Sequence, residues 1–191
     1  MAQTLQGPAK PAITTWNIDP SHSNAQFSLR HLMIANVRGE FTKVTGKVLY
    51  DQDKSEGLSA EAAIDVSTIN TREPARDNHL KSPDFFDMAN YPTISFKSKR
   101  AAKGPDGLKL TGDLTIHGVT REVTLDIEGP SSPLKDPWGF TRVGASATTR
   151  INRKDFGLTW NQALEAGGVL VGDDVKITVD VELVAQADNN K

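Results

Sequence analysis

The sequence predicts an all-β protein, an extended antiparallel barrel of about eight strands with a short helical insertion. Apolar residues alternate with polar ones along most of the 191-residue chain, which is the period of a sheet with one buried and one wet face. Turn-forming Gly, Asp, Asn and Pro separate the alternating runs. Closure into a barrel hides the sheet edges, although a two-sheet sandwich satisfies the same pattern.

Nine segments carry the alternation. In the segment 58–66, Leu58 and Ile64 share a face opposite Glu61 and Asp65. The other eight segments are 14–19, 25–30, 43–50, 93–98, 108–117, 121–128, 142–151 and 174–184. Together they predict one domain over residues 14–185, with polar tails at 1–13 and 186–191.

The segment TREPARDNHLKSPDFFD, residues 71–87, interrupts the alternation. Thr71 is a candidate cap for a first helical turn. The Ser-Pro pair at 82–83 is typical of the start of a second turn, which carries Phe85 and Phe86. Such an insertion can cover the mouth of a barrel, with apolar side chains inward and charges outward.

The predicted inward face mixes large residues such as Phe96 with many small ones. The small ones are Gly46, Ala60, Ala62, Gly112, Ala145 and Ala147. A packed interior usually needs more bulk, so these residues would leave room for an elongated apolar ligand. They would equally permit close approach of strands at barrel corners. The sequence leaves both interpretations open.

Composition excludes several classes of function. The formal net charge is −2 and the basic residues are scattered among acids, so nucleic acid is not an expected partner. The absence of cysteine excludes disulfides and thiolate metal sites. No window reaches the ~18 apolar residues of a transmembrane helix. Because the N-terminus lacks a signal-peptide pattern, the chain as given is expected in the cytoplasm, or in the periplasm if it is a processed form.

The pattern offers little for catalysis. The four histidines stand in four separate segments without metal-ligand spacing, so no metal site is expected. Nucleophile-elbow, phosphate-loop and dinucleotide motifs are missing from the sequence. Asp77 and His79 stand two apart on the expected helix and therefore do not face each other. Arg153 is expected to pair with Asp155 and brace its loop, or else to hold an anionic or carbonyl head group.

Several blocks together resemble the YceI-like family of bacterial proteins. They are WNIDPSHSNAQFSLRHLMIANVRGEF, INTREPARDNHLKSPDFFDMANYPTISFKS, LTGDLTIHGVTREVTLDI, RINRKDFGLTWN and DDVKITVDVEL. The resemblance covers Trp16 to about Val184. It implies a lipocalin-like barrel whose apolar tunnel binds, sequesters or transports a long-chain isoprenoid, either a polyprenyl lipid or an isoprenoid quinone, without a required cofactor or a catalytic residue.

Two alternatives remain beside this function. One is an enzyme acting on a lipid head group, and the other is a stress-response structural module whose cavity is filled by its own side chains. A homodimer is also left open.

The resemblance implies site residues as well. The tunnel and its ends would be formed by Phe27, Leu29, Phe41, Ala62, Ile64, Phe85, Phe86, Phe96, Leu114, Ala147, Phe156 and Trp160. A second set of polar motif residues would brace the helical cap or contact the head group. These are His22, His31, Arg76, Asp77, His79 and Arg153. Bracing is the preferred role, because buried polar groups usually satisfy backbone groups.

Overall fold

The computed structural model describes residues 14–51, 54–165 and 167–186, so the expected tails lie outside it except for Gln186. The strands are β1 (Thr14–Ile18), β2 (Asn24–His31), β3 (Ala35–Phe41), β4 (Val44–Asp51), β5 (Lys54–Asp65), β6 (Ile69–Asn70), β7 (Thr93–Gly104), β8 (Gly107–Ile116), β9 (Val119–Glu128), β10 (Leu134–Lys135), β11 (Thr141–Asn152) and β12 (Asp174–Ala185). The helices are α1 (Pro74–Lys81) and the 3-10 turns η1 (Val66–Thr68) and η2 (Arg153–Phe156).

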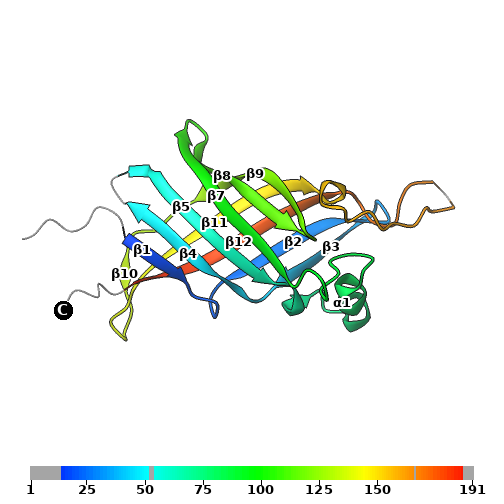
Figure 1. The fold of residues 1–191 in the computed structure, drawn as a ribbon, viewed down its shortest axis with the longest axis horizontal. Coiled ribbons are helices and arrows are strands. Elements are labelled where there is room, and N and C mark those ends of the chain that lie inside the picture. Colours follow the sequence, from blue (N-terminus) through cyan, green and yellow to red (C-terminus); the bar gives the residue numbers. More distant parts are fainter. Residues whose placement is uncertain (1–13, 52–53, 166, 187–191) are drawn as a thin grey trace, which may run out of the picture.

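Eight antiparallel strands close into a barrel in the order β1, β4, β5, β7, β8, β9, β11 and β12, and β12 returns to β1 (Figure 1). The length of β12 allows a branch in the wall. Its residues 183–185 pair with β1, whereas residues 176–180 pair with β2. Strands β3 and β6 follow β2 outward from this branch. Ring closure removes the free edges along the barrel, and the predicted fold class is confirmed.

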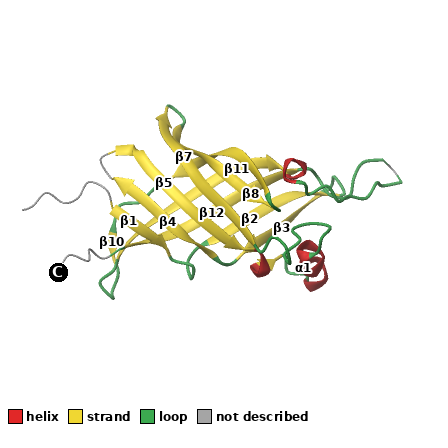
Figure 2. Cartoon of the chain, viewed as in Figure 1, coloured by secondary structure: helices red, strands yellow, loops and turns green. Residues whose placement is uncertain are grey.

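The helix α1 lies at the barrel end opposite β10, beside β6, which pairs with the last residues of β3 (Figure 2). It begins later than the sequence indicates, because Glu73 and not Thr71 caps its first turn. The second predicted turn is present. In it, the backbone amides of Phe85 and Asp87 both donate to the carbonyl of Ser82, at 3.0 and 2.9 Å. Three strands, β3 and the two-residue strands β6 and β10, were missed in the sequence, although Val37 and Phe41 of β3 alternate with Arg38 and Glu40.

Buried side chains fill the barrel end at which β1 lies. Trp16 and Val143 are each 3% exposed and Leu183 is 2% exposed, and all three belong to the core cluster. They come from β1, β11 and β12, which the barrel closure brings together. Packed side chains therefore close this end of the barrel, which we call the floor. The interior can open to solvent at the α1 end.

Candidate functional site: an apolar cavity with a braced mouth

A cavity of about 380 Å³ lies inside the barrel, and its wall is almost entirely apolar. Each of the eight barrel strands contributes to the wall. One lining residue from each, in chain order, is Ile18, Val48, Ala60, Ile94, Leu114, Ile127, Ala147 and Val179. The volume falls in the range of small-molecule sites, about 300–1,000 Å³.

Strand register explains which small residues face the cavity. Residues directly opposite each other in an antiparallel pair share a face. Ala145 and Ala147 stand opposite Val181 and Val179, and all four line the cavity. In the same way Ala62 stands between Gly46 and Phe96. The alanines therefore widen the interior.

The two glycines of the inward set serve close packing instead. A Cβ atom on Gly46 would lie 2.0 Å from the carbonyl oxygen of Glu61, and one on Gly112 would lie 2.4 Å from that of Lys97. Neither glycine lines the cavity. Both interpretations of the small residues thus hold, at different positions of the same sheet.

The predicted wall residues lie on the cavity with one exception, Phe156. Its ring is 1% exposed and belongs to the core cluster. In the sequence, Phe156, Leu158 and Trp160 stand at alternate positions, but η2 ends at Phe156 and Gly157 follows with a left-handed φ of 76°. The change of backbone direction leaves Leu158 and Trp160 on the cavity and Phe156 away from it.

Aromatic rings build the mouth. The imidazole of His79 on α1 stands edge-on to Phe85 and to Trp160, with ring centroids 5.1 and 4.9 Å apart. Phe85 and Trp160 contact each other at 5.2 Å. Such pairs join the helical cap to the loop that follows η2. Asp84 accepts a 2.9 Å hydrogen bond from His79, so the partner of His79 is not Asp77.

A buried threonine holds the cap. Thr71 is 3% exposed, and its backbone amide and its hydroxyl donate to the Asp77 carboxylate at 2.8 and 2.5 Å. Arg76 donates from Nε to the Thr71 hydroxyl and from Nη2 to the Thr71 carbonyl, at 2.8 and 2.7 Å. Asp77 and Arg76 thus brace α1 against the end of β6. Thr71 was expected as a helix cap, and it serves as the anchor of the whole segment.

On the other side of the mouth, the side chain of Arg153 is only 3% exposed and binds several backbone segments at once. We call it the hub of the mouth. Its guanidinium pairs with Asp173 at 3.1 Å, so the expected pairing with Asp155 is wrong. Its further hydrogen bonds go to the carbonyls of Leu158, Trp160, Val171 and Gly172, at 2.6, 2.8, 3.3 and 3.0 Å. Burial lowers the pKa of Arg153, and Asp173 opposes that shift. The side chain remains charged, as arginine does in proteins.

The sequence contains no signal for this hub. Asp173 lies 20 residues from Arg153, and the carbonyls come from a loop without alternation. Leu170 and Val171 belong to that loop and line the cavity. Sequence reasoning missed both, because the loop has no alternation.

His22 lies away from the cavity. Its Nδ1 is 3.1 Å from Asp19 and 3.8 Å from Glu182. Arg142 donates to both carboxylates and to Asp136. Asp19, His22 and Glu182 are the potential metal ligands that come together among the described residues. Because Arg142 already occupies the carboxylates, the group is a satisfied ion-pair network on the outer surface and not a cation site.

This network predicts a pH dependence. The hydrogen bond from Arg142, helped by the Ser21 amide and by His22, lowers the pKa of Asp19 to about 2. A carboxylate with a depressed folded-state pKa stabilises the fold above its unfolded pKa of about 4, and that contribution is lost as pH falls through about 2. The free energy of unfolding, measured by urea titration between pH 5 and 2, should therefore fall more steeply in the wild type than in Asp19→Asn. Parallel curves would contradict the assignment.

The ionisable side chains that line the cavity are basic residues and histidines, namely His31, Arg76, His79 and Arg153. No carboxylate appears on the described wall. Arg76 and Arg153 both donate hydrogen bonds to protein acceptors. Among the four ionisable lining residues, His31 is the one for which the described part of the chain shows no side-chain hydrogen bond.

Known proteins share both the motif blocks and the fold of this chain. A family model described as a YceI-like domain matches residues 16–183. The UPF0312 protein SA2479 of Staphylococcus aureus is 40% identical over 171 residues, which cover 89% of this chain and 97% of that protein. Among the described residues, no helix is long and apolar enough to cross a membrane.

Two solved structures share the architecture. The YceI protein of Campylobacter jejuni superimposes with a TM-score of 0.68 at 31% identity, covering 83% of this chain and 90% of that one. A polyisoprenoid-binding domain from Saccharophagus degradans superimposes with a TM-score of 0.65 at 15% identity, covering 91% of this chain and 99% of that one. At 15% identity, the similarity to the Saccharophagus degradans domain shows the fold alone.

Proposed function

The chain belongs to the YceI-like domain family, as its motif blocks predict, and we propose that it binds a long-chain isoprenoid lipid in the barrel cavity. The observation that carries the proposal is the continuous apolar wall to which all eight strands contribute. A linear hydrocarbon gains about 0.8 kcal/mol for each CH2 group it buries. Tight binding therefore needs no catalytic group and no polar anchor deep in the barrel.

The polarity of the cavity supports an orientation for the ligand. The apolar floor at β1 suits the hydrocarbon end, whereas the basic residues and histidines gather near α1 and the loop after η2. A head group with acceptor oxygens, such as a quinone carbonyl or a phosphate, would lie at this mouth. His31 is the side chain we propose as its donor, since Arg76, His79 and Arg153 already have protein partners.

The function we propose is sequestration or transfer, without turnover. The wall and the mouth would form the binding site. The hydrogen bonds around Thr71 and Arg153 would hold the cap and the loop after η2 in place. The name of the Saccharophagus degradans domain, which states polyisoprenoid binding, supports the same ligand class.

Organic-solvent extraction of protein purified from its natural host tests the proposal. We expect mass spectrometry to recover one long-chain isoprenoid at close to one molecule per chain. Delipidated protein should then take up an added quinone or polyprenol. Recovery of no lipid, together with no uptake of either compound, would show that the cavity is structural. Recovery of a shortened or dephosphorylated isoprenoid after incubation would instead favour an enzyme acting on the head group.

A further inference from the structure

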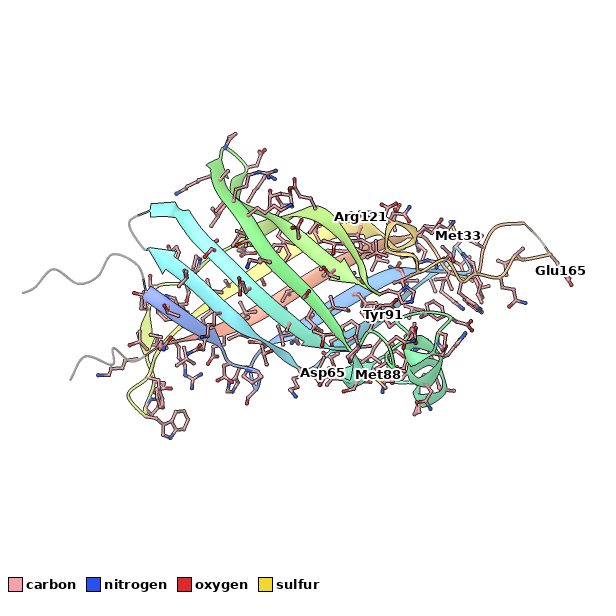
Figure 3. All side chains as sticks on the ribbon, in the orientation of Figure 1. Met33, Asp65, Met88, Tyr91, Arg121 and Glu165 are labelled. Carbon is pink, nitrogen blue, oxygen red and sulfur yellow. The ribbon has the colours of Figure 1, made fainter. Side chains whose placement is uncertain are left out.

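Two loops project beyond the barrel at the mouth. One is the β2–β3 turn, Leu32–Ile34, and the other is the loop formed by the described residues 161–165 and 167–171. They are tied together, because the amide of Leu32 donates to the carbonyl of Leu170 at 2.9 Å, and His31 forms an isolated β-bridge with Val171. We call this pair of loops the mouth tips. Figure 3 shows Met33 and Glu165 at this end of the molecule.

The mouth tips are apolar and almost without charge. Their sequences, LMI and NQALEAGGVLV, contain one charged residue, Glu165. Met33 is 56% exposed and Ile34 is 78% exposed. Projecting turns are usually polar and rich in Gly, Asn and Asp. Large apolar side chains held in water at a loop tip are a feature that folding alone does not require.

The backbone of the turn strengthens this observation. Leu32 and Met33 have φ values of 52° and 62°, in the left-handed region that Gly and Asn adopt more readily. The chain thus keeps bulky apolar residues at two strained positions. Strain at such positions is commonly found where function demands the side chain.

We propose that the mouth tips dock on a lipid bilayer and insert Met33 and Ile34 into its interface. The proposal rests on the proposed function, because a carrier of a membrane lipid must meet a membrane. The apolar surface of the tips is continuous with the cavity, since His31, Leu170 and Val171 line the cavity where the tips begin. An isoprenoid chain could therefore pass between bilayer and barrel along apolar side chains.

A bilayer suits this surface better than a protein partner. A stable protein interface buries about 800 Å² on each partner, whereas the tips offer two fully projecting side chains on narrow loops. Insertion into a bilayer needs a small apolar protrusion without charges, because charges near hydrocarbon are costly. The turn Leu32–Ile34 meets this condition, and the one charged residue of the tips, Glu165, lies on the other loop (Figure 3). Arg30 lies at the base of the turn, where it donates to the carbonyl of Ile34 at 3.4 Å, so a cation lies beside the apolar side chains.

A second exposed apolar group provides the matched control. Leu134, Trp138 and Phe140 are 71%, 78% and 54% exposed and belong to the β10–β11 hairpin, at the end opposite α1. A docking site there would point the cavity mouth away from the membrane. Leu134→Asp removes as much exposed apolar surface as a tip variant while leaving the mouth unchanged.

The experiment measures partition of the full chain onto phosphatidylcholine vesicles by flotation. We expect the wild type and Leu134→Asp to float alike, and Met33→Asp and Ile34→Asp to partition at least tenfold less. Aspartate tolerates the left-handed backbone of position 33, so the fold should survive, which thermal unfolding will check. Uptake of a short-chain isoprenoid quinone in vesicle-free solution should be equal in all four proteins.

Each other outcome overturns docking at the tips. A wild type that stays in solution, or a loss caused by Leu134→Asp alone, would do so. A tip variant that dissociates a dimer in light scattering, with no change in flotation, would assign the surface to a second copy of the chain. Quinone uptake separates the two proposals, because uptake without flotation removes only the docking, and flotation without uptake removes only the proposed function.

Discussion

Replacing Ala147 by phenylalanine is expected to weaken isoprenoid binding about a hundredfold while the barrel stays folded. Ala147 faces the cavity between Val179 and Ile127, its partners on β12 and β9. A phenyl ring there would occupy the space of about four methylene groups, each worth about 0.8 kcal/mol of burial. The affinity for a long isoprenoid should therefore fall by about two orders of magnitude. Isothermal titration with a quinone of matched chain length measures the loss.

The neighbouring residue supplies the control. Thr148 pairs with Thr178 and Asp126 and does not line the cavity, so Thr148→Phe adds the same ring on the outer face. Its affinity should equal that of the wild type. The Ala147→Phe protein should keep its stability within about 1 kcal/mol, because the ring enters empty space and displaces no packed side chain. Unchanged uptake by Ala147→Phe would mean that the ligand lies elsewhere.

Replacing Arg153 by methionine is expected to be the most destabilising single change at the mouth. Methionine fills much of the same volume but donates nothing, so the carbonyls of Leu158, Trp160 and Gly172 lose their side-chain donor. Asp173 keeps its ion pair with Lys154, and the Val171 carbonyl keeps its hydrogen bond from Asn161. Leaving buried carbonyls without their donor costs about 1–3 kcal/mol. Urea unfolding should show a loss of that size, and hydrogen exchange should show the loop 158–173 opening before the barrel.

Two further variants define what the arginine does. Lysine carries the charge without the planar fork of donors, so Arg153→Lys should recover only a minor part of the stability. Arg150→Met removes an exposed arginine from β11, the strand that precedes η2, and should change stability by less than about 0.5 kcal/mol. A loss below about 1 kcal/mol in Arg153→Met would contradict the role of Arg153 as the hub of the mouth.

The alternation of residues was sufficient for the barrel strands, because burial of one sheet face imposes a period of two on any sequence that forms it. It failed for the two-residue strands β6 and β10, which are too short to show a period, and after η2, where a turn changes the direction of Phe156. Local chemistry was also readable, such as the turn that begins at Ser82. Partners distant along the chain were not, as the pairing of Arg153 with Asp173 illustrates.

The sequence by itself determined the fold class, the family and the kind of surface that faces inward. Only the tertiary structure decided how the small residues are used, because an alanine and a glycine on the same face look alike until the distance to the next strand is known. Ala147 has open space in front of it, whereas Gly46 has the Glu61 carbonyl 2.0 Å from where its Cβ would lie. The cavity, its braced mouth and the apolar tips beside it depend on which strands meet, and strand closure is a property of the whole chain.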